Sequence, residues 1–357
     1  MGINFMQAFI ENEVPSACKP ANLAVEANSR EEKFLVIDLY NVVDTFSEDP
    51  SIAFDFFQWK LNFQAFLFKL KEFDIRPIFV EDGPHSSVSP NNLKSWTQRG
   101  YQKYKKVIKA FADLERGTLP EKLPKLRPGE VSELLKFELG YQDWVFEPQL
   151  DQEGDRLCVA LAIKYKAFGI LSQDSDFLAF QYPLDIKLFS SQHLNVKTLD
   201  TKFYDREALV NYLGVEIGQM PLLATLKGND FVAWNSLVQF HRSLIKPFSK
   251  RVDCFKAIKS IAGFIRENPN LDCSELVKIA FNDPSNAALL EQSIKNHCSR
   301  LAKIAFNKPS KATLIEQSIK NYHLTRDEID NSETNHNQGL LEEWKIYHLG
   351  TRMEVRK

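Results

Sequence analysis

Residues 153–176 read EGDRLCVALAIKYKAFGILSQDSD. The stretch begins with a segment whose apolar residues recur at helical spacing, and it continues into the apolar run FGILS at 168–172. A short apolar run of this length is typical of a buried strand, and Asp174 and Asp176 follow it directly. The stretch therefore predicts a helix, a buried strand and an acidic loop, in that order.

Further apolar runs of strand length occur in the first two-thirds of the chain. They are FLVID (34–38), RPIFV (76–80), WVF (144–146) and IKLF (186–189). A helical pattern at 52–73 separates the first two of them. Because alternating helices and near-continuous apolar strands are typical of a parallel sheet covered on both faces, we expect an α/β fold with a parallel central sheet flanked by helices.

Acidic residues follow three of these apolar runs, begin the helical stretch before FGILS, and close the segment LLATLKGND. Seven stand out: Asp38, Asp82, Glu153, Asp155, Asp174, Asp176 and Asp230. Ligands gather outside the carboxyl ends of parallel strands, so we expect several of these acids to converge there. Grouped carboxylates repel one another unless a cation neutralises them, and oxygen ligands suit Mg²⁺. The set therefore predicts a metal site.

Each acid also has a purely structural explanation. Asp82 lies in the turn-like segment EDGP, and Glu153 and Asp155 suit the first turn of a helix. Asp174 is a candidate N-cap for the helix that follows it. Taken one at a time, these explanations are as good as metal binding. Seven acids in this order together favour the metal site.

Four segments resemble signatures of the flap endonuclease/XPG superfamily of structure-specific nucleases. They are MGINFMQAFIE, QEGDRLCVALA, ILSQDSDFLAF and LLATLKGNDF. The EGDR sequence and the phrase MPLLATLKGNDF are most similar to the asteroid branch, whereas the constitutive-coactivator branch lacks much of the acidic set. The resemblance covers residues 1–265 and implies a PIN/XPG-like fold.

The resemblance implies a Mg²⁺-dependent endo- or exonuclease that hydrolyses DNA or RNA by a two-metal mechanism, with Mn²⁺ as a substitute and a role in DNA repair. It implies one ion held by Asp38, Asp82, Glu153 and Asp155. It implies a second ion held by Asp174, Asp176 and Asp230, with Asp155 bridging. Gly2 is expected beside this active site, against the nucleic acid. The alternative is a catalytically silent nucleic-acid-binding or scaffold protein that retains the fold.

A basic segment at 93–112, within an expected arch at 91–115, contains no acid. Its candidate nucleic-acid contacts are Lys94, Trp96, Arg99, Tyr101, Lys103, Tyr104, Lys105, Lys106 and Lys109. Lysine and arginine contact phosphates, and aromatic rings stack on unpaired bases. The resemblance makes Lys94 and Arg99 candidates for contact with the scissile phosphate. The alternative is a solvated helix face.

The segment after Asp230 lacks the Gly-x-Gly pattern with which flap endonucleases grip duplex DNA. We therefore expect single-stranded or overhang-containing nucleic acid as the partner.

The chain is expected to divide into a nuclease domain at 1–250, a helical extension at 251–330 and a polar linker with a short tail at 331–357. The extension contains a tandem repeat, at 273–297 and 298–322. A duplicated helical hairpin that packs on the body explains this repeat best, and a site for a protein partner is the alternative.

The composition narrows the class of protein further. The net charge of −2 gives no global basic field, so attraction to nucleic acid must be local. The five cysteines form no C-x-x-C pair, which argues against a disulfide framework or a zinc site. No signal peptide or membrane span is recognisable. We expect an intracellular protein with no membrane partner, nuclear or cytoplasmic, with the nucleus favoured.

Overall fold

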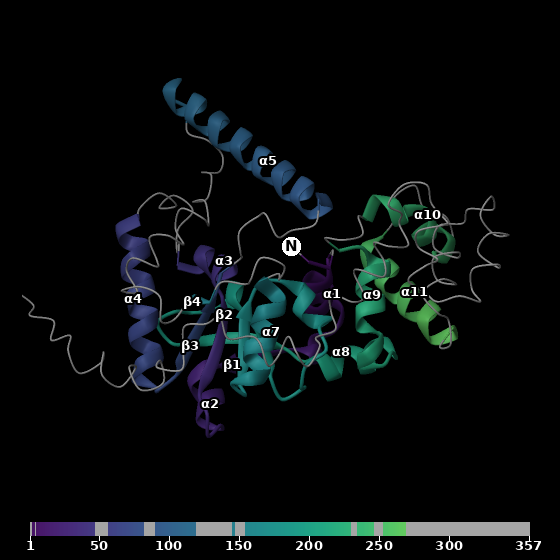
Figure 1. Ribbon diagram of the computed structural model, residues 1–357. Coiled ribbons are helices and arrows are strands. Elements are labelled where there is room, and N and C mark those ends of the chain that lie inside the picture. The colour runs from purple at the N-terminus through teal and green to yellow at the C-terminus, as the bar shows by residue number, and fades with distance from the viewer. Residues whose placement is uncertain are drawn as a thin grey trace, which may run out of the picture.

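The computed structural model describes residues 2–3, 5–46, 56–81, 90–118, 145–146, 154–229, 234–245 and 253–268 (Figure 1). The tandem repeat, the linker and the tail lie outside these ranges, as do Asp82, Glu153 and Asp230.

One seven-stranded sheet forms the centre of the molecule, in the order β1-β7-β6-β5-β2-β3-β4. Its strands are β1 (Cys18–Asn22), β2 (Phe34–Asp38), β3 (Arg76–Val80), β4 (Val145–Phe146), β5 (Gly169–Ser172), β6 (Lys187–Ser190) and β7 (Asp200–Tyr204). The five strands from β6 to β4 are parallel. The predicted α/β fold with a parallel central sheet is therefore confirmed.

The structure adds two antiparallel strands that the sequence analysis did not predict. β7 pairs with β6 and with β1, which extends the sheet beyond its parallel part. The sequence of β1 is CKPAN, and its side chains are half-buried or exposed. A strand of this composition lacks the apolar run that identifies a buried strand.

Helices cover both faces of the sheet, because side chains along each strand point alternately to opposite faces. In β2, Val36 belongs to the core beneath α7 (Gly154–Lys164), and Ile37 belongs to the core beneath α4 (Phe56–Glu72). Both residues are fully buried. Figure 1 shows α4 on one side of the sheet and α7 on the other.

Eight further α-helices lie within the described residues, and several of them share one core with α7. They are α1 (Met6–Glu13), α2 (Leu23–Asn28), α3 (Leu39–Val42), α5 (Pro90–Glu115), α8 (Arg206–Leu213), α9 (Met220–Lys227), α10 (Trp234–Leu244) and α11 (Cys254–Glu267). α9, α10 and α11 pack together in the same core as α1 and α7. None of the helices within the described ranges is long and apolar enough to cross a membrane.

The predicted basic segment lies in α5, a single helix of 26 residues. In Figure 1, α5 extends over the end of the molecule where α3 and the N-terminus lie. Most of its described side chains are exposed. Ala110 is the one buried residue among those whose side chains the structure describes.

Candidate metal centre

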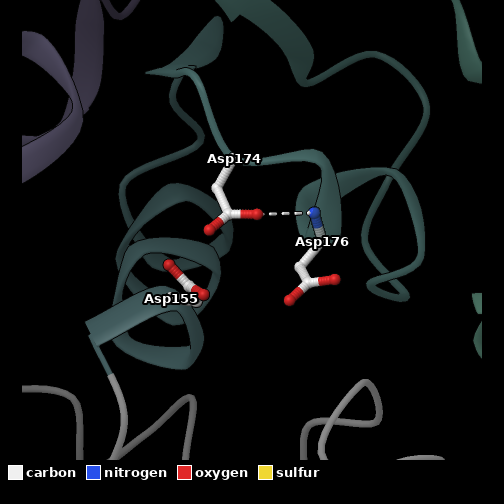
Figure 2. A group of neighbouring side chains, drawn as sticks. All are labelled: Asp155, Asp174 and Asp176. Atoms are coloured by element: carbon white, nitrogen blue, oxygen red, sulfur yellow. Dashed lines mark hydrogen bonds between the residues drawn. The ribbon is translucent and has the colours of Figure 1, made fainter. Parts of the chain in front are cut away.

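Three carboxylates converge at one edge of the sheet. Oxygen atoms of Asp155, Asp174 and Asp176 all lie within 4.8 Å of one another (Figure 2). Asp155 comes from the first turn of α7, and the other two come from the loop that follows β5. Asp174 is 5% exposed and Asp176 is 6% exposed. Such burial of neighbouring carboxylates is costly without a counter-charge.

The loop after β5 is folded by its own polar side chains. Asp174 Oδ1 accepts a hydrogen bond from the Asp176 amide at 3.0 Å, which caps the short 3₁₀ turn at Ser175–Leu178 (Figure 2). The N-cap expected for Asp174 is therefore present. A carboxylate has two oxygens with several acceptor sites, so a cap at Oδ1 is compatible with cation binding by the same group.

Asp38 joins this cluster through Ser172. The Ser172 hydroxyl donates to Asp38 Oδ2 at 2.8 Å and accepts from the Asp174 amide at 2.9 Å. Burial raises the pKa of Asp38 to about 6, the hydrogen bond from Ser172 opposes the rise, and the charge of Asp174 adds to it. Asn41 also donates to Asp38 Oδ2, at 2.5 Å. The ionised form of Asp38 is therefore disfavoured while its neighbours carry negative charge.

Strand order explains why these acids meet. β2 and β5 are adjacent, yet the chain continues from β2 towards β3 on one side and from β5 towards β6 on the other. Ligands of open parallel sheets bind at such a reversal, outside the carboxyl ends of the two strands. Asp38 ends β2, and Asp174 follows β5. The two acids therefore lie at this topological reversal.

The N-terminal segment covers the acidic loop. A Cβ atom at Gly2 would lie 2.0 Å from Asp174 Oδ1 and 2.9 Å from the Asp176 amide nitrogen. The backbone of Gly2 has a φ of +82°, in the region that favours glycine. The Ser175 hydroxyl donates to the carbonyl oxygen of Ile3 at 3.1 Å. Only a residue without a side chain fits between this segment and Asp174.

Three of the seven predicted acids lie outside the described residues, namely Asp82, Glu153 and Asp230. Their described neighbours, Glu81 and Asn229, are buried. Glu81 ends the run after β3, and its Oε1 accepts a hydrogen bond from the Tyr40 hydroxyl at 3.3 Å. Metal binding stays a prediction for all seven acids.

Ser172 and Glu81 are two residues of this site that the sequence does not predict. Each is the last residue of its apolar run or follows it directly, so the signal that identified the acids also marks these two positions. A serine at a strand end has many structural roles, so residue type alone does not identify Ser172 as part of a site.

The basic segment presents exposed rings and lysines. Tyr101 is 57% exposed and Tyr104 is 45% exposed, and the Lys105 ammonium lies 4.7 Å from the Tyr101 ring centroid. Lys106 and Lys109 are exposed as well. Lys94, Trp96, Arg99 and Lys103 belong to α5, but the structure does not describe their side chains.

The donor set is suited to a hard divalent cation. The described cluster consists of carboxylates alone, and hard oxygen donors match Mg²⁺ or Mn²⁺. A cation there would offset both the mutual repulsion and the rise in the pKa of Asp38. The residues present therefore fit the metal that the sequence predicts.

Comparison with known proteins gives two groups of relatives. A family model described as a FAM120A-like domain matches residues 213–325. The human constitutive coactivator of peroxisome proliferator-activated receptor gamma is 24% identical over 258 residues, with 70% of this chain and 28% of that protein covered. Flap endonuclease 1 of Eremothecium gossypii is 23% identical over 245 residues, with 65% and 61% covered. The chain thus spans less than two-thirds of either relative.

Two solved structures are similar as well. One is the catalytic core of Rad2 in complex with a DNA substrate, with a TM-score of 0.46, 19% identity and coverage of 94% of this chain and 87% of that one. The other is human GEN1 in complex with Holliday junction DNA, with a TM-score of 0.47, 14% identity and coverage of 91% and 67%. These likenesses assign no role to any residue of this chain.

Proposed function

We propose that this chain is a divalent-metal-dependent nuclease of the asteroid type, within the flap endonuclease/XPG superfamily, that hydrolyses phosphodiesters of DNA or RNA. The observation that carries the proposal is the convergence of Asp155, Asp174 and Asp176 within 4.8 Å, next to Asp38. Capping of the turn at Ser175–Leu178 occupies one oxygen of Asp174 and is compatible with cation binding by the same carboxylate.

The proposed division of labour follows the resemblance. One Mg²⁺ is assigned to Asp38, Asp82, Glu153 and Asp155. The second is assigned to Asp174, Asp176 and Asp230, with Asp155 shared. Bound Mg²⁺ lowers the pKa of water and stabilises charge on phosphate oxygens. No cysteine or histidine nucleophile is needed for this chemistry.

The protein's own residues hold the donor oxygens in place. Ser172 orients Asp38 and fixes the amide of Asp174, so the ends of β2 and β5 keep one spacing. Gly2 allows the N-terminal backbone to close over Asp174 without a side chain between them. These contacts reduce the freedom of the carboxylates before any cation binds, which favours tight and well-oriented binding.

We assign substrate contact to α5. Its exposed tyrosines offer stacking surfaces, and Lys105, Lys106 and Lys109 offer charge for phosphates. Lys94 and Arg99 are proposed to reach the scissile phosphate. Trp96 and Lys103 belong to the same proposed surface.

The second candidate is a nucleic-acid-binding or scaffold protein without catalysis. The coactivator relatives and the FAM120A-like match at residues 213–325 favour it. The described acids favour catalysis, because neighbouring carboxylates repel one another and a divalent cation would offset that repulsion.

A cleavage assay separates the two candidates. Purified protein is incubated with labelled single-stranded, overhang, duplex and flap oligonucleotides, with Mg²⁺, with Mn²⁺ and with EDTA. We expect metal-dependent products from the wild type and none from Asp174→Asn or Asp155→Asn.

The matched control is Asp253→Asn. Asp253 caps α11 through its Oδ1, which accepts from the Phe255 amide at 3.0 Å, as Asp174 caps its turn. Retained cleavage in this variant excludes a general effect of losing a capping charge. Binding without cleavage by the wild type, on every substrate and with either metal, supports the scaffold candidate instead.

A further inference from the structure

A lysine is buried at the end of α9, behind the N-terminal segment. Lys227 is 0% exposed, and its ammonium has no hydrogen-bond acceptor among the described residues. The ammonium lies 3.9 Å from the ring centroid of Trp234 and 5.7 Å from that of Phe5. A buried ammonium is costly unless something offsets its charge, and the negative faces of aromatic rings do so.

The ring of Trp234 is also held against α9 through His241. Its centroid lies 4.1 Å from that of His241, and His241 Nε2 lies 2.7 Å from the carbonyl oxygen of Leu226. Burial lowers the pKa of His241 to about 4, so the imidazole is neutral near pH 7 and adds no second positive charge. The contact with His241 therefore holds the Trp234 ring in place against the Lys227 ammonium.

The second ring near the Lys227 ammonium is that of Phe5, which belongs to the N-terminal segment. Its backbone has a φ of 63°, which is an outlier for a bulky residue, and its side chain is 59% exposed. Strained conformations of this kind persist where surrounding contacts determine them. The contact with the Lys227 ammonium is one that ties this exposed ring to the body.

The same short segment covers the acidic loop. Two residues before Phe5, the carbonyl oxygen of Ile3 accepts from Ser175, and Gly2 lies against Asp174. The N-terminal segment therefore contacts Lys227 through Phe5, and it contacts the loop that carries two of the clustered carboxylates through Gly2 and Ile3.

We propose that Lys227 is a positioning residue, whose ammonium on the rings of Phe5 and Trp234 holds the N-terminal segment 2–5 over the Asp174–Asp176 loop. The consequence for metal binding rests on the proposed function. The consequence for the N-terminal segment does not.

Packing alone does not explain a lysine at this position. A methionine has similar length and volume and carries no charge that must be removed from water. Replacing a buried charge by an apolar residue of similar size is often neutral or stabilising. Lys227→Met is thus expected to keep or raise the melting temperature while it releases the N-terminal segment.

Hydrogen exchange of metal-free protein tests the proposal at residues 2–9. We expect faster exchange there in Lys227→Met, on the order of tenfold, which is the loss expected for one desolvated cation–π contact. Phe5→Leu removes the ring at an exposed position and should give the same increase, whereas Phe5→Tyr keeps the ring and should match the wild type. Because both variants share one contact, Phe5→Leu should add little to Lys227→Met.

The control is Lys259→Met. Lys259 also lies near two rings, 5.9 Å from Phe9 and 5.8 Å from Tyr212, but it is exposed and paired with Glu13 on α1. Exchange at residues 2–5 should not change in this variant.

Three results would overturn the proposal. They are unchanged exchange in Lys227→Met, unchanged exchange in Phe5→Leu, and a fall in the melting temperature of Lys227→Met that accounts for its faster exchange. Mg²⁺ calorimetry then tests the link to the metal: weaker binding by both variants is expected. If wild-type protein binds no Mg²⁺, the proposed function fails, while the exchange result still decides the role of Lys227.

Discussion

The hydroxyl of Ser172 donates a hydrogen bond to Asp38 Oδ2 at 2.8 Å, and this bond joins the carboxyl ends of two adjacent parallel strands. The same hydroxyl accepts from the amide of Asp174 at 2.9 Å. A single side chain thereby fixes the spacing of the two acids that lie on either side of the topological reversal. It also favours the ionised form of Asp38 against the effect of burial.

Ser172→Ala is expected to raise the pKa of Asp38 above its value of about 6, because the hydrogen bond that favours the ionised carboxylate is lost. The acidic limb of the pH profile of Mg²⁺ binding should then move to higher pH. We also expect a loss of about 1–3 kcal/mol in the free energy of unfolding, as for a buried group left without a partner. Calorimetric Mg²⁺ titrations at several pH values and urea unfolding measure the two effects.

Ser172→Thr retains a hydroxyl at the same position and is the control for this variant. Its pH profile should stay close to that of the wild type. A profile in Ser172→Ala that does not move would show that the hydroxyl has no influence on Asp38.

Asp174→Asn is expected to separate stability from metal binding. The amide oxygen still caps the turn at Asp176, but one of the repelling charges is gone, so metal-free protein should be as stable as the wild type or more stable, by roughly 1 kcal/mol. A bound cation raises the melting temperature in proportion to its affinity for the native state. The Mg²⁺-induced rise seen in the wild type should be lost in Asp174→Asn and kept in Asp253→Asn. An equal rise in all three proteins would place the cation elsewhere.

Gly2→Ala is expected to damage the site directly. The added Cβ would lie 2.0 Å from Asp174 Oδ1, at a φ of +82° that alanine adopts only with strain. We expect a loss of about 1–2 kcal/mol in stability, together with a fall in Mg²⁺ affinity. Gly218→Ala is the matched control, because a Cβ at Gly218 meets nothing within 4 Å. Equal Mg²⁺ affinity in the two variants would contradict the close approach of the N-terminal segment to the loop.

The buried Lys227 predicts a stability change at alkaline pH. Burial lowers the pKa of its ammonium to about 8, from an ordinary value of 10.5. Between these values the unfolded chain binds more protons than the folded one, so this group's contribution to the free energy of unfolding rises with pH. The rise is on the order of 3 kcal/mol at most. It should be missing from Lys227→Met, and it is measured as the difference between the two proteins unfolded in urea from pH 8 to pH 10. A constant difference over this range would show that the ammonium keeps its ordinary pKa.

The parallel part of the sheet was predictable, because each of its strands is an apolar run bounded by polar residues. FLVID and RPIFV match β2 and β3, and IKLF is offset from β6 by one residue at each end. The antiparallel strands were not predictable in the same way. β1 is half exposed and contains Pro20, so neither its composition nor its pattern separates it from a loop.

The position of the acidic cluster in the fold was predictable from the sequence, but the hydrogen bonds around it were not. The approach of Asp174 to Asp155 follows from the parallel sheet and from the helix that precedes β5. The hydroxyl link through Ser172 depends on one rotamer and one register, which no pattern of residue types encodes. The surroundings of Lys227 were also missed, because Phe5 and Trp234 are far apart in the sequence and meet only in the folded chain.

The surface of α5 predicts a preference for unpaired nucleotides. Tyr101 and Tyr104 lie one turn apart and are exposed, so each offers a face to a base. Stacking contributes about 1–3 kcal/mol per base. Tyr101→Leu and Tyr104→Leu should therefore weaken binding of a single-stranded oligonucleotide by amounts in this range. Fluorescence anisotropy with a labelled strand measures the loss.

The lysines of the same helix should act through phosphates. Lys105→Gln and Lys106→Gln are expected to lower the slope of log affinity against log salt by roughly 0.7 for each lost phosphate contact with a single strand. Lys259→Gln, which is remote from α5 along the chain, should leave the slope unchanged. Equal slopes in all of these proteins would identify α5 as a solvated helix without contact to nucleic acid.

Together these contacts predict the choice of substrate. The sequence after Asp230 carries no Gly-x-Gly pattern for gripping duplex backbone, whereas α5 offers two exposed rings and three exposed lysines. Two stacked bases would offset much of a missing duplex contact, at about 1–3 kcal/mol each. Cleavage should therefore be faster on single strands or overhangs than on a double-flap junction, and Tyr101→Leu should reduce that difference. Faster cleavage of the double flap, with no effect of Tyr101→Leu, would instead assign duplex recognition to the segment that follows Asp230.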